Sequence, residues 1–407
     1  MRLLIHDFAG HPFQAQLSRE LAARGHSVTH VYADGLSGPK GKLSNCSHDP
    51  MGISIRGIQL PAQFKKYSAH RRFCNQRKYA GDVKSVIQQL RPDAVLSGNT
   101  PIDVQAELLW HCRRRRIAFV HWIQDLYCQA LKFFLKRTLP LLAEPAAPIF
   151  ELVEKWVASQ SDHTVAVASD FRDVLCRWKV PESKVTVIEN WAALEEIPQL
   201  PRENNWSRAQ NLGRRPVLLY SGTLGMKHRP DLLYLLAKRT QPECTVVIIT
   251  DGIGREYLQK MPPLENLRLL PFQPYEALPE VLASADVLLA TLDAEAGKFA
   301  VPSKILTYLC AGRPILFAGP RENLSASIIE RSGAGLVVHP NELSAWVTAA
   351  RSLISDAGLR AQLGSKARSY ADRTFDIAKI GDAFENLLLS ACKPYASSTA
   401  VVSPLIA

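Results

Sequence analysis

Two lysines stand in segments where a phosphate-bearing ligand would need positive charge. Lys304 follows Ser303 at the start of ILTYLC, an apolar run with helical spacing. Lys227 lies in YSGTLGMKH, where Gly222 and Gly225 permit a turn that comes close to a ligand. Because the N-terminus of a helix carries unsatisfied N–H groups, it favours bound phosphate. These residues therefore predict an anion-binding site.

The structural alternative for Lys304 is a solvent-exposed lysine at the start of a capped core helix. Ser303 is a good N-cap residue, and Gly312 followed by Pro314 is a typical helix stop. The apolar side chains of this helix would pack it on a sheet. They are Ile305, Leu306, Leu309 and Cys310. The rest of the chain must decide between the two interpretations.

Further glycine-bearing segments follow predicted strands. DFAGHPF contains Gly10, and TDGIG contains Asp251 and Gly252. The segment that ends at Lys304, EAGKFAVPSK, also carries Glu295. Each alone could be an ordinary turn. Together with the two lysine-bearing segments they favour a diphosphate-bearing ligand, bound chiefly by the second half of the chain.

The chain alternates predicted strands and helices, which indicates an α/β fold with parallel sheets. No G-x-G-x-x-G motif follows the first strand, which argues against a dinucleotide dehydrogenase. The expected strands cover 2–8, 27–33, 93–98, 117–123, 162–169, 184–190, 217–222, 244–250, 266–272, 286–292, 315–317 and 333–338. The expected helices cover 11–26, 79–92, 104–116, 229–239, 275–285, 303–311, 342–354, 357–371 and 377–392.

The 407 residues are too many for one ordinary domain. A stretch rich in proline and asparagine, from Ala192 to Pro216, interrupts the rhythm and predicts a linker. Two α/β domains in tandem usually bind ligand in the crevice between them. The expected divisions are an N-terminal domain over 1–195, a linker over 196–215, a C-terminal domain over 216–375, a helix over 376–393 that returns to the first domain, and a disordered tail over 394–407.

Composition excludes several classes of protein. No apolar run is long enough to span a bilayer, and the N-terminus does not resemble a secretion signal. The eight cysteines contain no C-x-x-C pair, which favours free thiols in the cytoplasm over a zinc site. The net charge of +11 suits an anionic partner, although the run Arg113 to Arg116 also complements a helix dipole. No nucleic-acid motif appears.

Five segments, in this order, carry a resemblance to a known family. They are DFAGHPFQAQLSRELAARGHSVTHVY, VIENWAALEEI, NNWSRAQNLGRRPVLLYSGTLGMKH, NLRLLPFQPYEALPEVLASADVLLATL and VPSKILTYLCAGRPIL. Over roughly residues 1–390 the chain resembles the family 4 retaining glycosyltransferases of the GT-B fold. It is most similar to the bacterial branch that builds capsule, O-antigen and colanic-acid-type exopolysaccharides. The resemblance implies two Rossmann-like, doubly wound parallel sheets facing a cleft.

The resemblance also implies roles for residues of this chain. Asp125, Lys227 and Lys304 are expected to be catalytic. The donor diphosphate and nucleotide would be bound by Gly10, Gly222, Thr223, Gly225, Lys227, Asp251, Gly252, Gln273, Ser303, Lys304 and Thr307. The donor sugar and acceptor would lie near His11, Gln124, Asp125 and Glu295.

Three positions depart from the family pattern. Thr307 stands where many members have a second glutamate that binds ribose, and Thr223 replaces a usual arginine. Gln124 replaces the histidine of a His-Asp pair, while Asp125 is kept. The phosphate charge would therefore fall to the two lysines.

The resulting expectation is a hexosyl-, N-acetylhexosaminyl- or deoxyhexosyl-transferase that moves a sugar from a nucleotide-diphosphate donor to a lipid-linked glycan acceptor. Helix amides and lysines can stabilise the leaving diphosphate without a metal, so we expect no cofactor and no metal site. The expected substrate is a UDP-, GDP- or dTDP-sugar. A sugar-nucleotide epimerase of similar fold and a non-catalytic nucleotide-sugar-binding subunit remain as alternatives. A nucleic-acid-binding protein is a more remote one.

The last expectation concerns an anionic membrane surface. Phe133, Phe134 and Leu135 lie among Lys132, Lys136 and Arg137, while prolines at 140, 145 and 148 forbid a spanning helix. The segment could insert at an interface or pack on the first domain as a helical insertion. The resemblance favours insertion, and hence a cytoplasmic protein bound peripherally to the inner leaflet.

Overall fold

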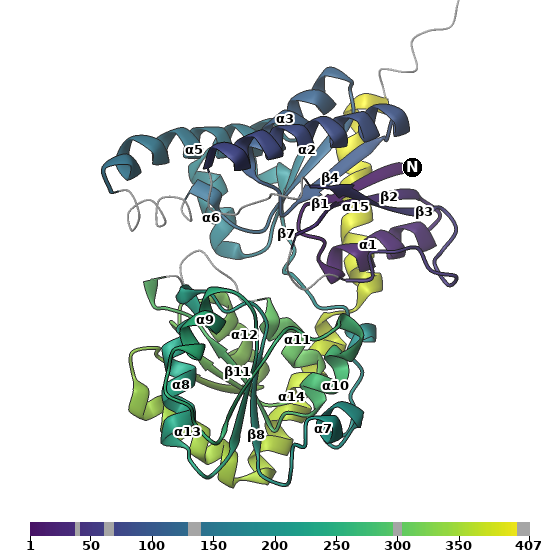
Figure 1. Ribbon diagram of the computed structural model, residues 1–407. Coiled ribbons are helices and arrows are strands. Elements are labelled where there is room, and N and C mark those ends of the chain that lie inside the picture. The colour runs from purple at the N-terminus through teal and green to yellow at the C-terminus, as the bar shows by residue number, and fades with distance from the viewer. Residues whose placement is uncertain (37–40, 61–68, 129–139, 296–302, 397–407) are drawn as a thin grey trace, which may run out of the picture. The chain divides into compact units, whose positions relative to one another are not determined.

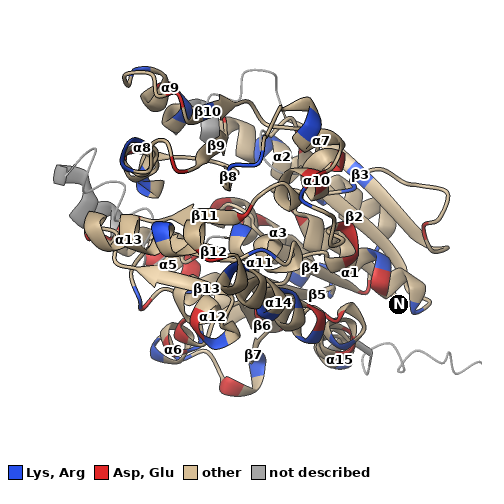
Figure 2. Cartoon of the chain, turned by 90° about the horizontal axis from the view of Figure 1, so that it is seen from below, with Lys and Arg blue, Asp and Glu red and all other residues tan. Residues whose placement is uncertain are grey.

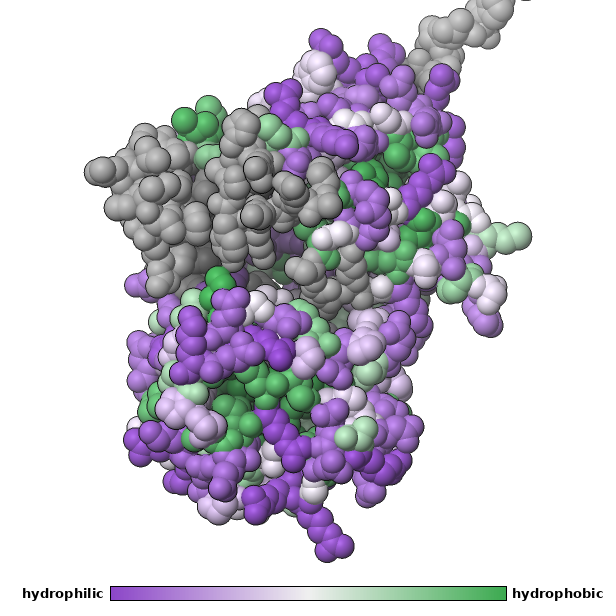
Figure 3. Space-filling view, viewed as in Figure 1, coloured by the Kyte–Doolittle hydropathy of each residue, from purple (hydrophilic) through white to green (hydrophobic). Residues whose placement is uncertain are grey.

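The computed structural model describes residues 1–36, 41–60, 69–128, 140–295 and 303–396 (Figure 1). The chain divides into two compact units, which are described separately below. Unit 1 comprises Met1–Glu189 together with the segment that begins at Ile377, and unit 2 comprises Asn190–Asp376. On the visible face of unit 2, hydrophilic residues surround a central group of hydrophobic ones (Figure 3).

Unit 1 is built on a seven-stranded sheet in the order β3-β2-β1-β4-β5-β6-β7, with every neighbouring pair parallel. Its strands are β1 (Arg2–Asp7), β2 (Ser27–Asp34), β3 (Ile53–Gln59), β4 (Ala94–Gly98), β5 (Ala118–Ile123), β6 (His163–Ala166) and β7 (Val185–Val187). Its helices are α1 (Pro12–Ala23), α2 (Ala69–Leu90), α3 (Ile102–Arg114), α5 (Pro140–Gln160), α6 (Ser169–Arg177) and α15 (Ile377–Ala396).

Helices cover both faces of this sheet. Helices α2, α3 and α5 form one layer, and α1 and α15 lie on the other face (Figure 1). The central strands are therefore buried on both sides, and all six residues of β5 are buried. Such continuous burial explains why these strands read as apolar runs rather than as alternating patterns.

Helix α15 belongs to unit 1 although it ends the described chain. The ring of Phe384, on α15, lies 4.7 Å from that of Trp122 on β5. Arg24 binds the carboxylates of Asp382 and Glu385 at 2.6 and 2.9 Å. An apolar contact and an ion-pair cluster thus fix the helix on the sheet. The helix extends to Ala396, so the first residues of the expected tail are helical.

Unit 2 is built on a six-stranded parallel sheet in the order β10-β9-β8-β11-β12-β13. Its strands are β8 (Val217–Ser221), β9 (Thr245–Ile249), β10 (Leu267–Leu270), β11 (Val287–Thr291), β12 (Ile315–Ala318) and β13 (Gly335–Val338). Its helices are α7 (Asn205–Ala209), α8 (Pro230–Arg239), α9 (Ile253–Gln259), α10 (Leu278–Ala283), α11 (Lys304–Cys310), α12 (Leu324–Ser332), α13 (Leu343–Ser355) and α14 (Ala357–Thr374).

The segment expected as a linker, 196–215, lies inside unit 2 and does not separate the units. It contains helix α7, whose Trp206 side chain is buried. Arg202 donates to Asp286 at 2.8 Å and to the carbonyls of Gly213 and Arg215 at 3.1 and 2.7 Å. The proline-rich composition therefore reflects an irregular path across the surface of a domain.

The two units confirm the expected α/β class with two Rossmann-like sheets. The elements absent from the expected strands and helices include β3, α5, α6, α7, α9 and α12. Strand β3 has no fully buried residue and contains Arg56 and Gly57, so it lacks the apolar run of a central strand. Among the described helices, none is both long and apolar enough to cross a membrane.

We predict that Phe384→Ala destabilises the protein by about 3–5 kcal/mol, because it leaves a cavity against Trp122. Leu389→Ala, on the same helix but 45% exposed, should change stability by less than about 0.5 kcal/mol. Urea denaturation followed by circular dichroism measures both. Equal effects of the two substitutions would contradict the docking of α15 on β5.

Candidate functional site

The candidate site in unit 2 lies where its strand order reverses. Strands β8 and β11 are neighbours, and the chain proceeds from them in opposite directions across the sheet. Open parallel sheets bind ligands at the carboxyl ends of the strands at such a point. The segment after β8 carries Lys227, and the segment after β11 leads to Lys304.

The ammonium group of Lys304 is buried without a hydrogen-bond partner among the described residues. The residue as a whole is only partly buried, but its Nζ atom is inaccessible to solvent. It lies 3.6 Å from the ring centroid of Tyr220, a cation–π contact. Burial, and secondly the charge of Lys227, hold the pKa of Lys304 well below its usual range. This ammonium therefore lacks a compensating anion.

Gly222 lies directly beside this lysine, at a backbone position that favours glycine. Its φ of +128° lies in a region that residues with side chains rarely adopt. A Cβ atom there would lie 3.4 Å from both Cε and Nζ of Lys304. The Gly222 N–H donates to the Ile249 carbonyl at 3.0 Å, which fixes the glycine at the sheet edge. Its Cα hydrogens thus face the ammonium group.

The turn that carries Lys227 is held by His228. The His228 Nδ1 atom accepts the N–H of Gly225 at 3.0 Å. Burial, followed by the charges of Lys304 and Lys227, lowers the pKa of His228 to about 2. The imidazole is therefore neutral at pH 7, and its Nε2 atom carries the proton. Sequence reasoning missed this residue, whose signal was its position next to Lys227.

Two contacts join the segments after β8 and β11. The Asp293 N–H donates to the Lys227 carbonyl at 2.7 Å, and the Thr291 hydroxyl donates to the His228 carbonyl. Lys227 itself is exposed. These bonds fix its backbone while its side chain stays free to reach a ligand.

Tyr308 anchors helix α11 to the end of β8. Its buried hydroxyl accepts the Ser221 N–H at 3.0 Å and lies 3.2 Å from the Ser221 carbonyl, to which it donates. Because Lys304 lies one turn earlier on this helix, the anchor positions its side chain against Tyr220. Sequence reasoning treated this position only as part of an apolar run.

The expected cap of α11 is wrong in its details. Ser303 has helical backbone angles, is exposed, and makes no side-chain capping bond. The expected stop is confirmed: the helix ends at Cys310, and Gly312 follows with φ +64°. Thr307 is partly buried on this helix. Glu295 is exposed, and its N–H donates to the Asp293 carboxylate at 3.0 Å.

The expected nucleobase residues connect the ends of β9 and β10. The Asp251 carboxylate accepts the Phe272 N–H at 3.1 Å and contacts Arg255 at 3.3 Å. The Gln273 Oε1 atom accepts the Trp206 indole N–H at 3.0 Å, and its Nε2 donates to Pro271 at 2.9 Å. Both ends of the glutamine amide are therefore occupied within unit 2. Sequence reasoning missed Trp206 because its segment was expected to be a linker.

Gly254, two residues beyond Gly252, brings this region close to the segment after β8. Its N–H donates to the Leu224 carbonyl at 2.9 Å. A Cβ atom at Gly254 would lie 2.1 Å from that carbonyl oxygen, closer than any side chain allows. A larger residue would therefore separate the two loops. Thr223, one residue before Leu224, is exposed on the same loop.

In unit 1, Gly10 and His11 lie at the carboxyl end of β1. The buried Asp7 carboxylate accepts the N–H groups of Ala9, at 3.1 Å, and of His11. Gly10 has φ +74°, and its N–H donates to the Asp7 carbonyl at 3.2 Å. Asp7 therefore determines the shape of this loop, a role that its sequence context did not reveal.

Gln124 and Asp125 follow β5 directly. Gln124 is buried, whereas Asp125 is exposed. The next turn is held by Glu154, a buried residue of α5 whose carboxylate accepts the N–H groups of Tyr127 and Cys128 at 2.9 and 3.0 Å. Burial raises the pKa of Glu154. An unpredicted carboxylate thus positions the loop that begins with these two residues.

The structure brings Gly222, Lys227 and Lys304 together at one edge of unit 2. Gly10, His11, Gln124 and Asp125 belong to unit 1, so their expected meeting with the lysines across a cleft stays a prediction. Of the expected membrane segment, which runs from Tyr127 to Trp156, residues 129–139 lie outside the described residues, and the rest from Pro140 onward belongs to α5. Within the described part of the chain, no three metal-ligating side chains gather.

Two family models match successive parts of the chain. The model "Glycosyltransferase Family 4" matches residues 14–196, and the model "Glycosyl transferases group 1" matches residues 202–370. The "Putative colanic acid biosynthesis glycosyl transferase WcaI" of Escherichia coli (strain K12) is 29% identical over 167 residues, which are 40% of each chain. The D-inositol 3-phosphate glycosyltransferase of Salinispora arenicola is 25% identical over 254 residues, or 56% of this chain and 54% of the relative.

The matched segments therefore span about half the length, or less, of these two relatives. Among solved structures, Anabaena HepE in complex with UDP and glucose is similar with a TM-score of 0.69 and 15% identity, over 96% of this chain and all of that one. This likeness shows the GT-B fold. The two family models together cover most of the chain, and they show that it belongs to the family 4 glycosyltransferases.

Proposed function

We propose that this protein transfers a sugar from a nucleoside-diphosphate donor to a glycan acceptor during synthesis of a bacterial surface polysaccharide. The observation that carries the proposal is the buried, uncompensated ammonium of Lys304 beside Gly222. A buried cation without a counter-ion is unfavourable, so it indicates a site whose anion arrives with a ligand.

The donor diphosphate is the anion that suits this site. When the glycosidic bond of the donor breaks, negative charge grows on the leaving phosphate oxygens. An ammonium already removed from water stabilises that charge strongly, because no solvent has to reorganise around it. Exposed Lys227 supplies a second cation, and the Nε2–H of His228 offers a further neutral donor close to both.

We propose retention of configuration, with the departing phosphate accepting the acceptor proton. This requires no strong base and no metal, and it assigns the charge stabilisation to Lys304 and Lys227. Asp125 would act from unit 1 near the donor sugar and acceptor, with His11, Gln124 and Glu295 in the same region. Ser303 and Thr307 would contact the nucleotide from helix α11.

The donor is proposed to be a UDP-, GDP- or dTDP-sugar. The UDP and glucose bound to Anabaena HepE support a uridine donor. Asp251, Gly252 and Gln273 lie at the carboxyl ends of β9 and β10, where a base would be enclosed between the two loops. The exposed backbone groups of these two loops would then determine which base is bound.

The acceptor is proposed to be lipid-linked, with the protein bound peripherally to the cytoplasmic face of the inner membrane. Exposed apolar residues on helix α5 support this proposal. Ile149 is 63% exposed and Leu152 is 67% exposed, while Phe150 and Trp156 are also exposed. Apolar side chains in an exposed helix of a basic protein suit an interfacial contact with anionic lipid.

Two alternatives share the donor site but not the reaction. A sugar-nucleotide epimerase would convert the donor without releasing a nucleoside diphosphate. A non-catalytic subunit would bind the donor without turnover. Release of a nucleoside diphosphate by the purified chain, only when an acceptor is present, distinguishes transfer from both.

Lys304→Ala should lower turnover by about 10²–10³, because it removes a stabiliser of the leaving diphosphate. Lys227→Ala should chiefly weaken donor affinity, since that lysine is exposed and reaches the ligand from solvent. Nucleoside-diphosphate release measures kcat and KM for both. Lys238→Ala, an exposed lysine on α8, is the control. Near-wild-type turnover of Lys304→Ala would refute the assignment of the diphosphate to this lysine.

Lys304→Met should raise the stability of the ligand-free protein by about 1 kcal/mol. It removes a buried charge without a partner, at the loss of the contact with Tyr220. The melting temperature of unit 2 should then rise by roughly 2–4 °C, while stabilisation by nucleoside diphosphates disappears. Differential scanning calorimetry measures both effects. A lower melting temperature would mean that the ammonium is satisfied in the free protein.

A further inference from the structure

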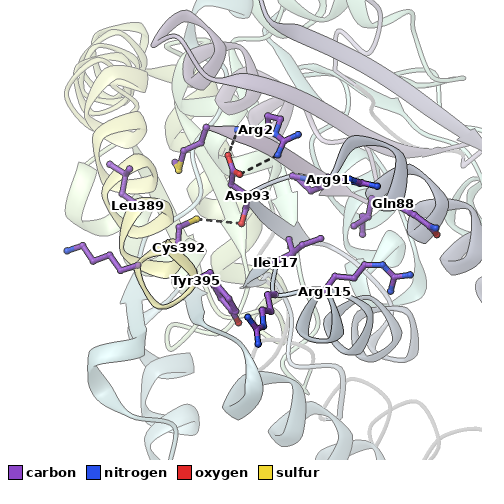
Figure 4. Close-up of a pocket in the computed structure, with 14 residues that line it drawn as sticks. Arg2, Gln88, Arg91, Asp93, Arg115, Ile117, Leu389, Cys392 and Tyr395 are labelled. Carbon is purple, nitrogen blue, oxygen red and sulfur yellow. Dashed lines mark hydrogen bonds and ion pairs between the residues drawn. The ribbon is translucent and has the colours of Figure 1, made fainter. Parts of the chain in front are cut away.

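A cavity of about 800 Å³ opens in unit 1 at the amino ends of its central strands (Figure 4). Arg2 begins β1, Asp93 precedes β4, and Ile117 precedes β5. The candidate residues Gly10 and Asp125 follow the opposite ends of β1 and β5. Because these strands span six residues, the two edges are roughly 20 Å apart. The cavity is therefore distinct from the loops that the proposed function uses.

Most of the charge around this cavity is positive. Its one lining carboxylate, Asp93, accepts the Arg2 N–H at 2.7 Å and lies 3.9 Å from the Arg2 guanidinium (Figure 4). Arg91, Arg116 and Lys393 also line the cavity, and in the described part of the chain no carboxylate pairs with them. Three cations at the cavity thus lack a counter-charge.

Arg115 adds a fourth uncompensated cation. Its guanidinium lies 3.2 Å from Nδ1 of His111. Burial, and secondly the charge of Arg115, lowers the pKa of His111 to about 4, so the histidine is neutral at pH 7. This contact orients the arginine without cancelling its charge. Lys and Arg residues occur on many elements of the chain (Figure 2). The group of arginines and Lys393 at this cavity is a local cluster among them.

Two of these arginines occupy backbone positions that favour glycine. Arg91 follows the last residue of α2 with φ +45°, and Arg116 lies two residues beyond α3 with φ +56°. A residue just past a helix end with positive φ is usually glycine, because a side chain is strained there. The chain carries arginine at both positions, so two guanidinium groups line the cavity. The strained backbone at these arginines lowers the stability of the folded protein.

Apolar side chains complete the lining. Ile117 precedes β5, and Leu389, 45% exposed, extends from α15. The cavity therefore offers both cations and an apolar surface. Arginine forks match phosphate oxygens, while the apolar surface suits a hydrocarbon or aromatic group.

We propose that this cavity binds a phosphate ester that carries an apolar group. A lipid headgroup and a soluble phosphorylated metabolite share this chemistry. The phosphate contacts Arg91 and Arg116, with Arg115 and Lys393 contributing charge, and the apolar group packs against Leu389. The proposal does not depend on the donor site of unit 2.

The test compares two pairs of substitutions that remove the same two charges. Arg91→Gly with Arg116→Gly removes the guanidinium groups and relieves the backbone strain. Arg91→Gln with Arg116→Gln removes the charges and keeps the strain. Lys179→Gly is the matched control, because Lys179 also has positive φ, at +63°, beyond helix α6 of unit 1, but does not line the cavity.

All proteins carry Lys304→Ala, so that phosphate bound at the donor site contributes little. Titration calorimetry measures binding of phenyl phosphate and of inorganic phosphate. Flotation measures binding to vesicles of phosphatidylglycerol and phosphatidylcholine, compared with phosphatidylcholine alone.

Both substituted pairs should weaken binding on the order of tenfold per arginine, whereas Lys179→Gly should not. The glycine pair and Lys179→Gly should also raise the melting temperature, which excludes misfolding as the cause of lost binding.

The two arms identify the source of the ligand. Binding of phenyl phosphate, more tightly than inorganic phosphate, supports a soluble ester. Binding of phosphatidylglycerol vesicles alone, with the same dependence on the arginines, supports a lipid headgroup. The proposal is overturned if no probe binds, or if the arginine pairs bind every probe as tightly as the Lys304→Ala parent.

Discussion

The candidate site depends on an ammonium group held in a buried position without an anion. Lys304 lies against the ring of Tyr220 and beside Gly222, and no described residue accepts a hydrogen bond from it. Burial alone would favour a neutral or apolar side chain there. The neighbouring structure maintains this unfavourable arrangement through backbone contacts that involve no opposing charge. Tyr308 anchors the helix, and Gly254 keeps the adjacent loop close.

Elsewhere in unit 2, basic residues bind carbonyl groups and stabilise irregular segments. Arg313 donates to the Leu200 and Ala283 carbonyls at 3.0 and 2.7 Å, and Arg368 donates to Ile197 and Cys310 at 3.0 and 2.9 Å. These arginines hold the segment that was expected to be a linker. Part of the net charge of +11 therefore has a structural role. The lysines of the site differ from them because their ammonium groups remain available.

The sequence predicted those structural features that depend on a short, local pattern of residues. The alternation of apolar runs and amphipathic segments predicted both parallel sheets. It also predicted that the segments with Lys227 and Lys304 follow strands, although not that these strands, β8 and β11, are neighbours. Such features are local. The long-range partners were not predictable: Trp206 binds Gln273, and Glu154 binds the turn after Asp125. The Ser303 cap failed because a capping residue needs extended backbone angles, which sequence does not report.

Proton uptake on nucleotide binding tests the role of Lys304 most directly. Burial lowers the pKa of Lys304, so at alkaline pH this lysine carries less charge in the ligand-free protein than an exposed lysine does. A bound diphosphate restores the usual pKa, so binding should take up protons and weaken as pH rises. Titration calorimetry in buffers of different ionisation enthalpy measures this, with whichever of UDP, GDP or dTDP binds best. The account predicts net proton uptake by the wild type and its loss in Lys304→Met. Equal proton uptake by the two proteins would contradict the claim that this buried ammonium binds the donor diphosphate.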